Sequence, residues 1–180
     1  MRTVELQRTI RQLVAPTIER LGLDLVAVEV TGDRRGRVLR LSVDKPDGVT
    51  ISDCTEATWR LSPILEEEDP IAGKYHFEVS SPGLERPVQR VVDFERFSGL
   101  RVRVRLAEGH ERRRVTGTIG EVVDGVVLIH THDGEVAVDI QEVERAHLAL
   151  DPSEWAGLRD RLAASEATAP PAKESDDDHQ

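Results

Sequence analysis

The stretch EVSSPGLERP, residues 78–87, falls near the middle of the chain and separates two halves with different patterns. Each of its prolines holds the preceding residue extended, and Pro82 also fixes the φ of the second residue of a turn. Gly83 then supplies the positive φ that the third residue of a type II turn requires. The sequence therefore predicts a stiff turn, which suits either a rigid joint between two regions or a docking edge.

The segment before residue 51 shows first helical and then strand periodicity. Residues 3–21 carry apolar side chains three and four apart, which predicts an amphipathic helix that Pro16 kinks or restarts and Gly22 ends. Apolar residues alternate with others over 24–31 and 37–44, which predicts two strands joined by a hairpin loop.

A second helix is expected to start at Ser52 or Asp53, with Glu56 completing a capping box and Cys54, Ala57, Leu61 and Leu65 forming its buried stripe. Residues 74–80 alternate as a third strand that leads into the turn. The first half thus predicts an α+β domain of order α-β-β-α-β, with its helices on one face of a small sheet.

The second half predicts an all-β unit. After a short helical turn near residues 91–99 come four strand-like segments, 100–107, 112–120, 125–132 and 134–140, with no helix between them. Short strands at this spacing favour a small barrel. From about residue 165 the sequence lacks large apolar residues and ends in an acidic run, so a disordered tail is expected. The predicted domains are 1–87, 88–164 and 165–180, and the predicted buried face of the barrel is Val102, Val104, Val115, Ile119, Val127, Ile129, Val136 and Val138.

The charge balance bears on the kind of partner. A formal net charge of −10, spread along the chain, argues against binding of nucleic acid by bulk phosphate attraction and favours a basic protein partner. No apolar run reaches the roughly 20 residues of a membrane span, and the N-terminus lacks the apolar core of a signal peptide. A cytoplasmic protein without a membrane partner is expected.

The usual catalytic and metal-binding constellations are missing. Ser80 and Ser81 are not in a nucleophile elbow, and no base stands at recognisable spacing. His130 and His132 would share a strand face as two metal ligands do, but Asp133-Gly134 indicates a hairpin turn and no third ligand is evident. No nucleotide or dinucleotide fingerprint appears, so no cofactor is expected.

Arginines form the one dense basic cluster, at Arg112, Arg113 and Arg114, and Arg101, Arg103 and Arg105 share one face of a predicted strand. Both sets of arginines are interpreted as solvated surface that needs no further function. As an alternative they contact RNA phosphates, because guanidinium forks match phosphate oxygens. No aromatic stacking platform accompanies them, which argues against sequence-specific reading of single strands.

The central stretch, together with DFERFSG at 93–99, closely resembles the signature of the bacterial ribosome maturation factor RimP family. The resemblance extends to LVAPTIERLGLDLVAVEV (13–30), ISDCTEATWRLSPILEEEDPI (51–71), RVTGTI (114–119) and VERAHLAL (143–150). It implies an N-terminal α+β domain joined to an SH3-like or Sm-like barrel. It also implies a non-enzymatic assembly factor that binds the immature small (30S) ribosomal subunit and engages ribosomal protein twelve of that subunit.

We expect this protein to act as a monomer by binding, with the sheet of residues 24–44 and 74–81 as its docking surface. The residues predicted to carry the function are Ser80, Ser81, Pro82, Gly83, Leu84, Glu85, Arg86 and Pro87, with Arg112, Arg113 and Arg114 as a possible ribosomal RNA contact. The prolines and the glycine would set the shape, and Glu85 and Arg86 would make polar contacts or clamps. The alternative is a stand-alone RNA-binding barrel protein whose first half is only a scaffold.

Overall fold

A computed structural model describes residues 2–33, 36–83, 85–151 and 153–158. Residues 1–150 form one compact unit and residues 151–180 form a second. In the second unit residues 153–158 are helical, and the carboxylate of Asp151 accepts hydrogen bonds from the backbone N–H groups of Ser153 and Glu154 at the start of that turn. The tail predicted from residue 165 lies outside the described residues.

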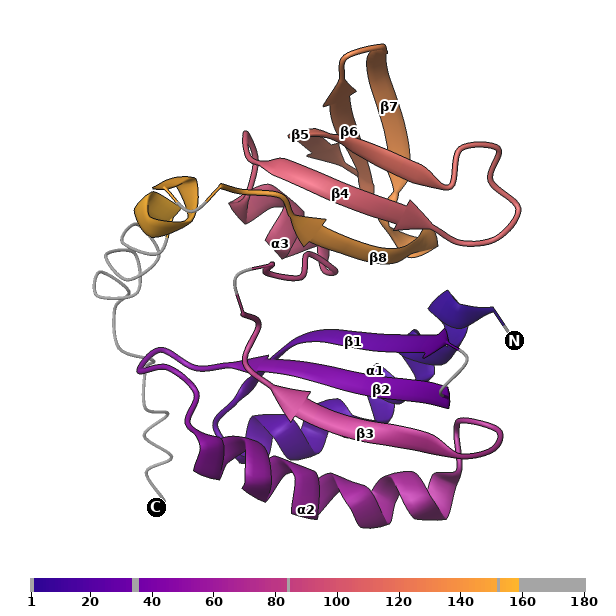
Figure 1. Cartoon of the computed structure of the whole chain (residues 1–180), viewed down its shortest axis with the longest axis vertical. Coiled ribbons are helices and arrows are strands. Elements are labelled where there is room, and N and C mark those ends of the chain that lie inside the picture. Colours follow the sequence, from indigo (N-terminus) through magenta and orange to yellow (C-terminus); the bar gives the residue numbers. More distant parts are fainter. Residues whose placement is uncertain (1, 34–35, 84, 152, 159–180) are drawn as a thin grey trace, which may run out of the picture. The chain divides into compact units, whose positions relative to one another are not determined.

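The first elements of the chain form an α/β region in the predicted order. They are α1 (Thr3–Arg20), β1 (Asp24–Asp33), β2 (Gly36–Asp44), α2 (Ile51–Glu68) and β3 (Tyr75–Ser80). The sheet has the order β1-β2-β3, in which β1 and β2 are antiparallel and β2 and β3 are parallel. Both helices lie on one face of this sheet, as expected (Figure 1).

The helix α1 runs without a break through Pro16, where the sequence predicts a kink or restart. Val14 and Ile18, on either side of the proline, are fully buried in the core, and this packing outweighs the loss of one backbone hydrogen bond. Gly22 follows the helix with φ +71°, so the predicted helix end is confirmed.

The start of α2 differs from the prediction. Its N-cap is Thr50, and Asp53 is the third residue of the helix, so Asp53 rather than Glu56 completes the capping box. Hydrogen bonds from Lys45 and then from Thr50 lower the pKa of Asp53 to about 2. Of the predicted stripe, Ala57, Leu61 and Leu65 are buried, whereas Cys54 is half-buried.

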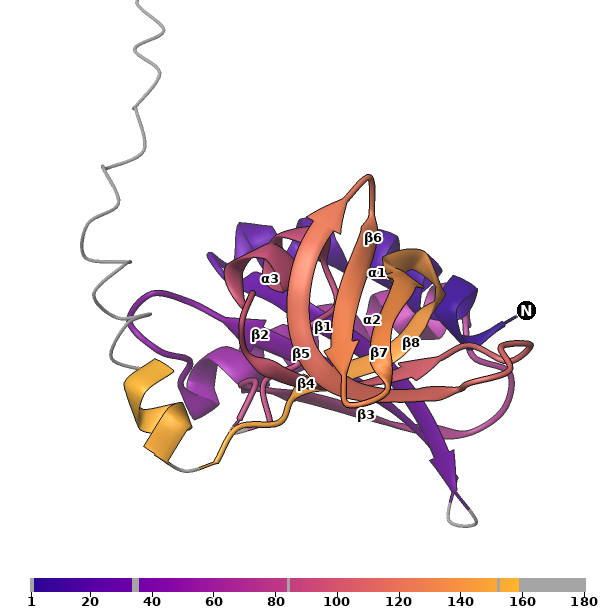
Figure 2. The same cartoon turned by 90° about the horizontal axis from the view of Figure 1, so that it is seen from above.

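The remaining strands of residues 1–150 form an antiparallel β-sheet region after the short helix α3 (Val91–Arg96). The sheet has the order β7-β6-β5-β4-β8. Figure 2 shows β5, β6 and β7 side by side, with β5 long and curved. The elements are β4 (Arg101–Leu106), β5 (Arg114–Val123), β6 (Val126–Thr131), β7 (Gly134–Asp139), the 3-10 turn η1 (Ile140–Glu142) and β8 (Val143–Leu148).

Two features of this sheet differ from the prediction. The strand β8 is absent from the predicted elements, because a register shift against β4 breaks its alternation and places its buried residues Val143, Ala146 and Leu148 at uneven spacing. Within residues 85–151 no pairing joins β7 to β8, so closure of the predicted barrel is not observed. The predicted buried face is confirmed except at Val136, which is half-buried.

No helix in the described part of the chain is long and apolar enough to cross a membrane.

Candidate functional site in the segment after β3

The segment of residues 80–87 leaves β3 where Ser80 pairs with Ser42 of β2. Gly83 has φ +68°, the positive value that the predicted turn requires, and a Cβ added there would meet no atom within 4 Å. The glycine is therefore needed for its backbone conformation and not for space. Leu84 lies outside the described residues.

The two serines carry no catalytic arrangement. Within the described residues neither hydroxyl, of Ser80 or of Ser81, forms a hydrogen bond with an imidazole or a carboxylate that could activate it. Together they line an open hollow of about 410 Å³, with Val79 and with residues at the start of α2: Val49, Thr50, Ile51, Cys54, Thr55 and Thr58.

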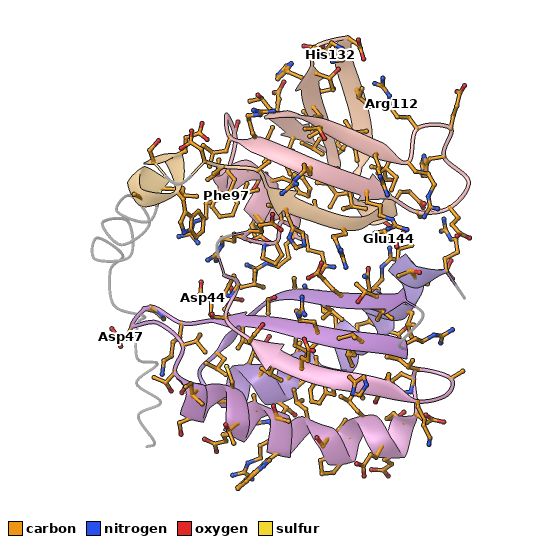
Figure 3. The ribbon with its side chains drawn as sticks, in the orientation of Figure 1. Asp44, Asp47, Phe97, Arg112, His132 and Glu144 are labelled. Atoms are coloured by element: carbon orange, nitrogen blue, oxygen red, sulfur yellow. The ribbon has the colours of Figure 1, made fainter. Side chains whose placement is uncertain are left out.

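Arg86 is the buried anchor of the segment, with 8% of its surface exposed. Its Nη1 donates to the Asp44 carboxylate at the end of β2 over 2.8 Å, and its guanidinium lies 5.7 Å from the centre of the Phe97 ring. Figure 3 labels Asp44 at the end of β2 and Phe97 beside α3. Burial of a charged side chain is tolerated only with such partners, so Arg86 is a structural clamp of the segment.

The backbone of residues 86–88 adds a short strand to the free edge of β8. The carbonyl of Arg86 accepts from the N–H of Leu148, Pro87 forms an isolated antiparallel bridge with His147, and the N–H of Val88 donates to Ala146. Proline at such an edge is compatible with pairing because the position needs no N–H donor. The second half of the segment is therefore fixed to the antiparallel sheet.

Glu85 lies on the surface and pairs with Arg103 of β4 at 2.6 Å. Both side chains are more than half exposed, so this ion pair adds little to stability. The predicted polar pair is thus divided: Arg86 is buried and structural, whereas Glu85 is accessible to a partner.

Sequence reasoning missed Gln89, which follows the segment directly. Its side-chain amide accepts a hydrogen bond from the N–H of Val28 on β1 at 2.9 Å and donates to the carbonyl of the same residue at 2.8 Å. The side-chain amide thus makes the two backbone hydrogen bonds that a neighbouring strand would make with β1 at this residue. Arg11 of α1 donates to the same amide oxygen at 2.6 Å. The local sequence contains no signal for these contacts.

Charged groups surround this junction. Arg90 caps α3 and pairs with Asp93 and Asp24, each at 2.7 Å, and the hydrogen bonds to Asp93 raise the pKa of Arg90. Burial lowers the pKa of Arg11, and the charge of Arg90 adds to that effect. Arg11 also donates to two carbonyls of β1, so its positive charge is held at the sheet edge.

Most of the arginine cluster at residues 112–114 is engaged with carboxylates. Arg112 pairs with Asp133 at 3.1 Å, and Arg113 pairs with Glu144 at 3.1 Å. Of these three arginines, Arg114 is the one that forms no ion pair with a described residue, and its side chain is exposed. The three predicted RNA contacts therefore differ: Arg112 and Arg113 already pair with carboxylates, whereas Arg114 does not.

The two histidines of the β6–β7 hairpin do not act together. His130 lies on β6 and pairs with Glu135, whereas His132 lies beyond the end of that strand, in the hairpin tip, and pairs with Asp133 (Figure 3). The turn is centred on His132 and Asp133 rather than on Asp133 and Gly134. In the described part of the chain no group of three or more His, Cys, Asp or Glu side chains could hold a metal ion.

The fold and this site together define a chain with an N-terminal α/β region, an antiparallel β-sheet region and an anchored connecting segment. Residues 13–85 match the family model of the RimP N-terminal domain. This match supports the RimP family of ribosome maturation factors and suggests a general role in ribosome maturation.

Proposed function

We propose that the chain is a non-enzymatic assembly factor that binds the immature small (30S) ribosomal subunit in the cytoplasm, as a monomer, and engages its ribosomal protein twelve. The match to the RimP family supports a ribosomal partner. The net charge of −10 supports a basic protein as the direct partner, because opposite net charges speed the encounter.

One observation carries the choice of the docking site. Residues 86–88 are fixed to β8, while Ser81, Gly83 and Glu85 earlier in the same segment are exposed. A stiff, exposed turn on an anchored base loses little conformational entropy when a partner binds. We therefore assign partner contact to the exposed residues and the positioning of the turn to Arg86 and Pro87.

The second sheet supports a proposal of an SH3-like or Sm-like barrel spanning residues 88–164. The register of β5 shifts between Ile119 and Val122, which bends the strand. A Cβ at Gly117 or Gly120 would collide with His130, so glycine permits the close approach of β5 and β6 at the bend. Curvature of this kind is what a small barrel requires.

Co-sedimentation of the full chain with immature and mature small subunits tests the function. Ser81→Arg places a long cation in the exposed turn and is expected to weaken binding to immature subunits about tenfold, equivalent to about 1.4 kcal/mol. Ser52→Arg, the same change at an exposed position on α2, is the matched control and should stay within about twofold of wild type.

The same assay addresses the alternative, an RNA-binding protein whose first region is only a scaffold. On that reading an added arginine at residue 81 leaves subunit binding unchanged or strengthens it, because it adds attraction to phosphate. Either result for Ser81→Arg would overturn the proposed docking site.

A further inference from the structure

Three arginines lie directly opposite one another across the antiparallel sheet. Arg105 of β4 is opposite Arg114 of β5 on one side and opposite Arg145 of β8 on the other. In the next row of the same face, Arg103 lies between Thr116 and His147. The arginines of β4 alternate with buried residues, so the row is on the outer face of the sheet.

The fold accounts for only part of this row. Neighbouring strands are about 4.8 Å apart, and like charges placed directly opposite destabilise a sheet. Glu29 and Glu144 balance Arg145 and Arg105, but Arg114 has no ion pair with a described residue, so the row carries more positive charge than these contacts require.

Two carboxylates that are largely shielded from solvent pair with two of these arginines. The Nε of Arg145 lies 3.0 Å from Glu29, and the Nε of Arg105 lies 3.5 Å from Glu144. The two carboxylates have only 5% and 16% of their side chains exposed. Neither Arg105 nor Arg145 donates a hydrogen bond from its Nη groups to a described residue, so these donors can bind another anion.

The other arginines of the face are still less constrained. Arg114 has no ion pair with any described residue. Among the residues that the structure describes, Arg103 pairs with the exposed Glu85 alone, and water and salt screen this pair. Both guanidinium groups can therefore accept a new anionic partner at small cost.

These side chains line an open hollow of about 350 Å³. Four arginines, the hydroxyl of Thr116 and the imidazole of His147 line it, against one carboxylate, that of Glu85. Guanidinium groups only donate hydrogen bonds, and their fork fits two oxygens of one phosphate. The lining therefore matches a phosphate.

We propose that this face, defined by Arg103, Arg105, Arg114 and Arg145, is a binding site for the phosphate backbone of RNA. Arg103 and Arg105 are two residues apart on β4, which spaces the two rows by about 7 Å and lets the face follow successive phosphates. Apart from His147 the lining has no aromatic ring, so it offers no base-stacking platform and the contact is independent of sequence.

The negative net charge of the chain makes RNA binding at this site depend on the salt concentration. Exposed charges more than about 10 Å apart are screened at 0.1 M salt, so at that salt the local arginines and not the total charge decide the contact. At lower salt the acidic remainder of the chain opposes RNA. The site goes beyond the proposed protein contact, and it can hold RNA whether or not Ser81 contacts a protein.

Fluorescence anisotropy of the full chain with a fluorescein-labelled 12-nucleotide uridine RNA, between 50 and 200 mM KCl, tests the proposal. Arg105→Ala/Arg114→Ala is expected to weaken binding at least about tenfold. It should also reduce the slope of log K against log salt by about 1.4, or about 0.7 for each phosphate that the protein no longer neutralises. Glu85→Gln releases Arg103 and should tighten binding about twofold to threefold.

The control is Arg60→Ala, which removes an exposed arginine from α2 and should change affinity less than about twofold. Equal effects of the control and the double variant would overturn the proposal, because they would indicate bulk charge. So would a ten-residue polyaspartate that competes with the RNA as well as unlabelled uridine RNA does, because it would identify an acidic peptide as the ligand. Thermal unfolding at an unchanged midpoint shows that the variants are folded.

Failure here is distinct from failure of the proposed function. Loss of RNA binding in the double variant, with subunit binding of Ser81→Arg unchanged, supports the arginine face and overturns the protein contact. Unchanged RNA binding in the double variant, with weakened subunit binding of Ser81→Arg, overturns the arginine face alone.

Discussion

The carboxylate of Glu29 on β1 lies 2.8 Å from Nε2 of His147 on β8, although the two residues are 118 positions apart. Arg145 pairs with the same carboxylate oxygen at 3.0 Å. Burial alone would raise the pKa of Glu29, but the hydrogen bond with His147 and the charges of His147 and Arg145 together outweigh burial and lower it. The carboxylate is therefore ionised and ties the first sheet to the last strand.

Glu29→Gln is expected to lower the free energy of unfolding by about 1–3 kcal/mol, because the amide keeps the size of the buried side chain but leaves His147 and Arg145 without a charged acceptor. Urea denaturation measures this loss. Glu78→Gln, which removes the carboxylate from an exposed pair with Arg40, is the matched control and should cost less than about 1 kcal/mol.

The effect of Glu29 should depend on pH in a defined direction. Because its folded-state pKa is lowered, its contribution to stability is fully present above the unfolded-state pKa of about 4.3 and is lost as the pH falls through the folded-state value. The difference between wild type and Glu29→Gln should shrink as the pH falls below about 4. A difference that grows in acid would contradict this assignment.

Gln89→Ala removes both hydrogen bonds that the side-chain amide makes with the backbone of Val28. We expect a loss of about 1–3 kcal/mol, since a part-buried N–H and a carbonyl lose their partners. Amide hydrogen exchange at Val28 should become faster relative to that at Leu41 in the middle of the sheet. Gln141→Ala, at an exposed glutamine with one long contact to Arg8, should change neither quantity; equal effects of the two variants would show that Gln89 is not a special partner of β1.

The elements predicted correctly share one property, namely that local periodicity determines them. The alternation in β2 and β3, and the spacing of Ile10, Val14 and Ile18 in α1, place one face of each element against the core. Gly83 is predictable for a similar reason, because a Pro-Gly pair restricts the backbone without help from distant residues.

The features that escape prediction depend on distant partners. Arg86 would be expected at the surface, and its burial depends on Asp44, 42 residues earlier. Gln89 functions through Val28, 61 residues earlier, and nothing in its neighbours indicates this. In β8 the register shift breaks the alternation, and only pairing with β4 makes the strand recognisable. The arginine row appears only when β4, β5 and β8 are set side by side.

Substitutions at Gly83 distinguish whether the connecting segment acts through its backbone shape or through direct contact with the partner. A Cβ there meets open space, so substitution acts only through the backbone: valine resists φ +68°, whereas asparagine tolerates it. Gly83→Val is expected to cost about 1–2 kcal/mol and to weaken co-sedimentation with immature subunits, while Gly83→Asn should cost a few tenths of that and bind as wild type does. Because both variants add a side chain to the same open site, steric interference with the partner would weaken both alike. That pattern would argue for direct contact at residue 83, and wild-type binding by both would show that the turn need not keep its shape.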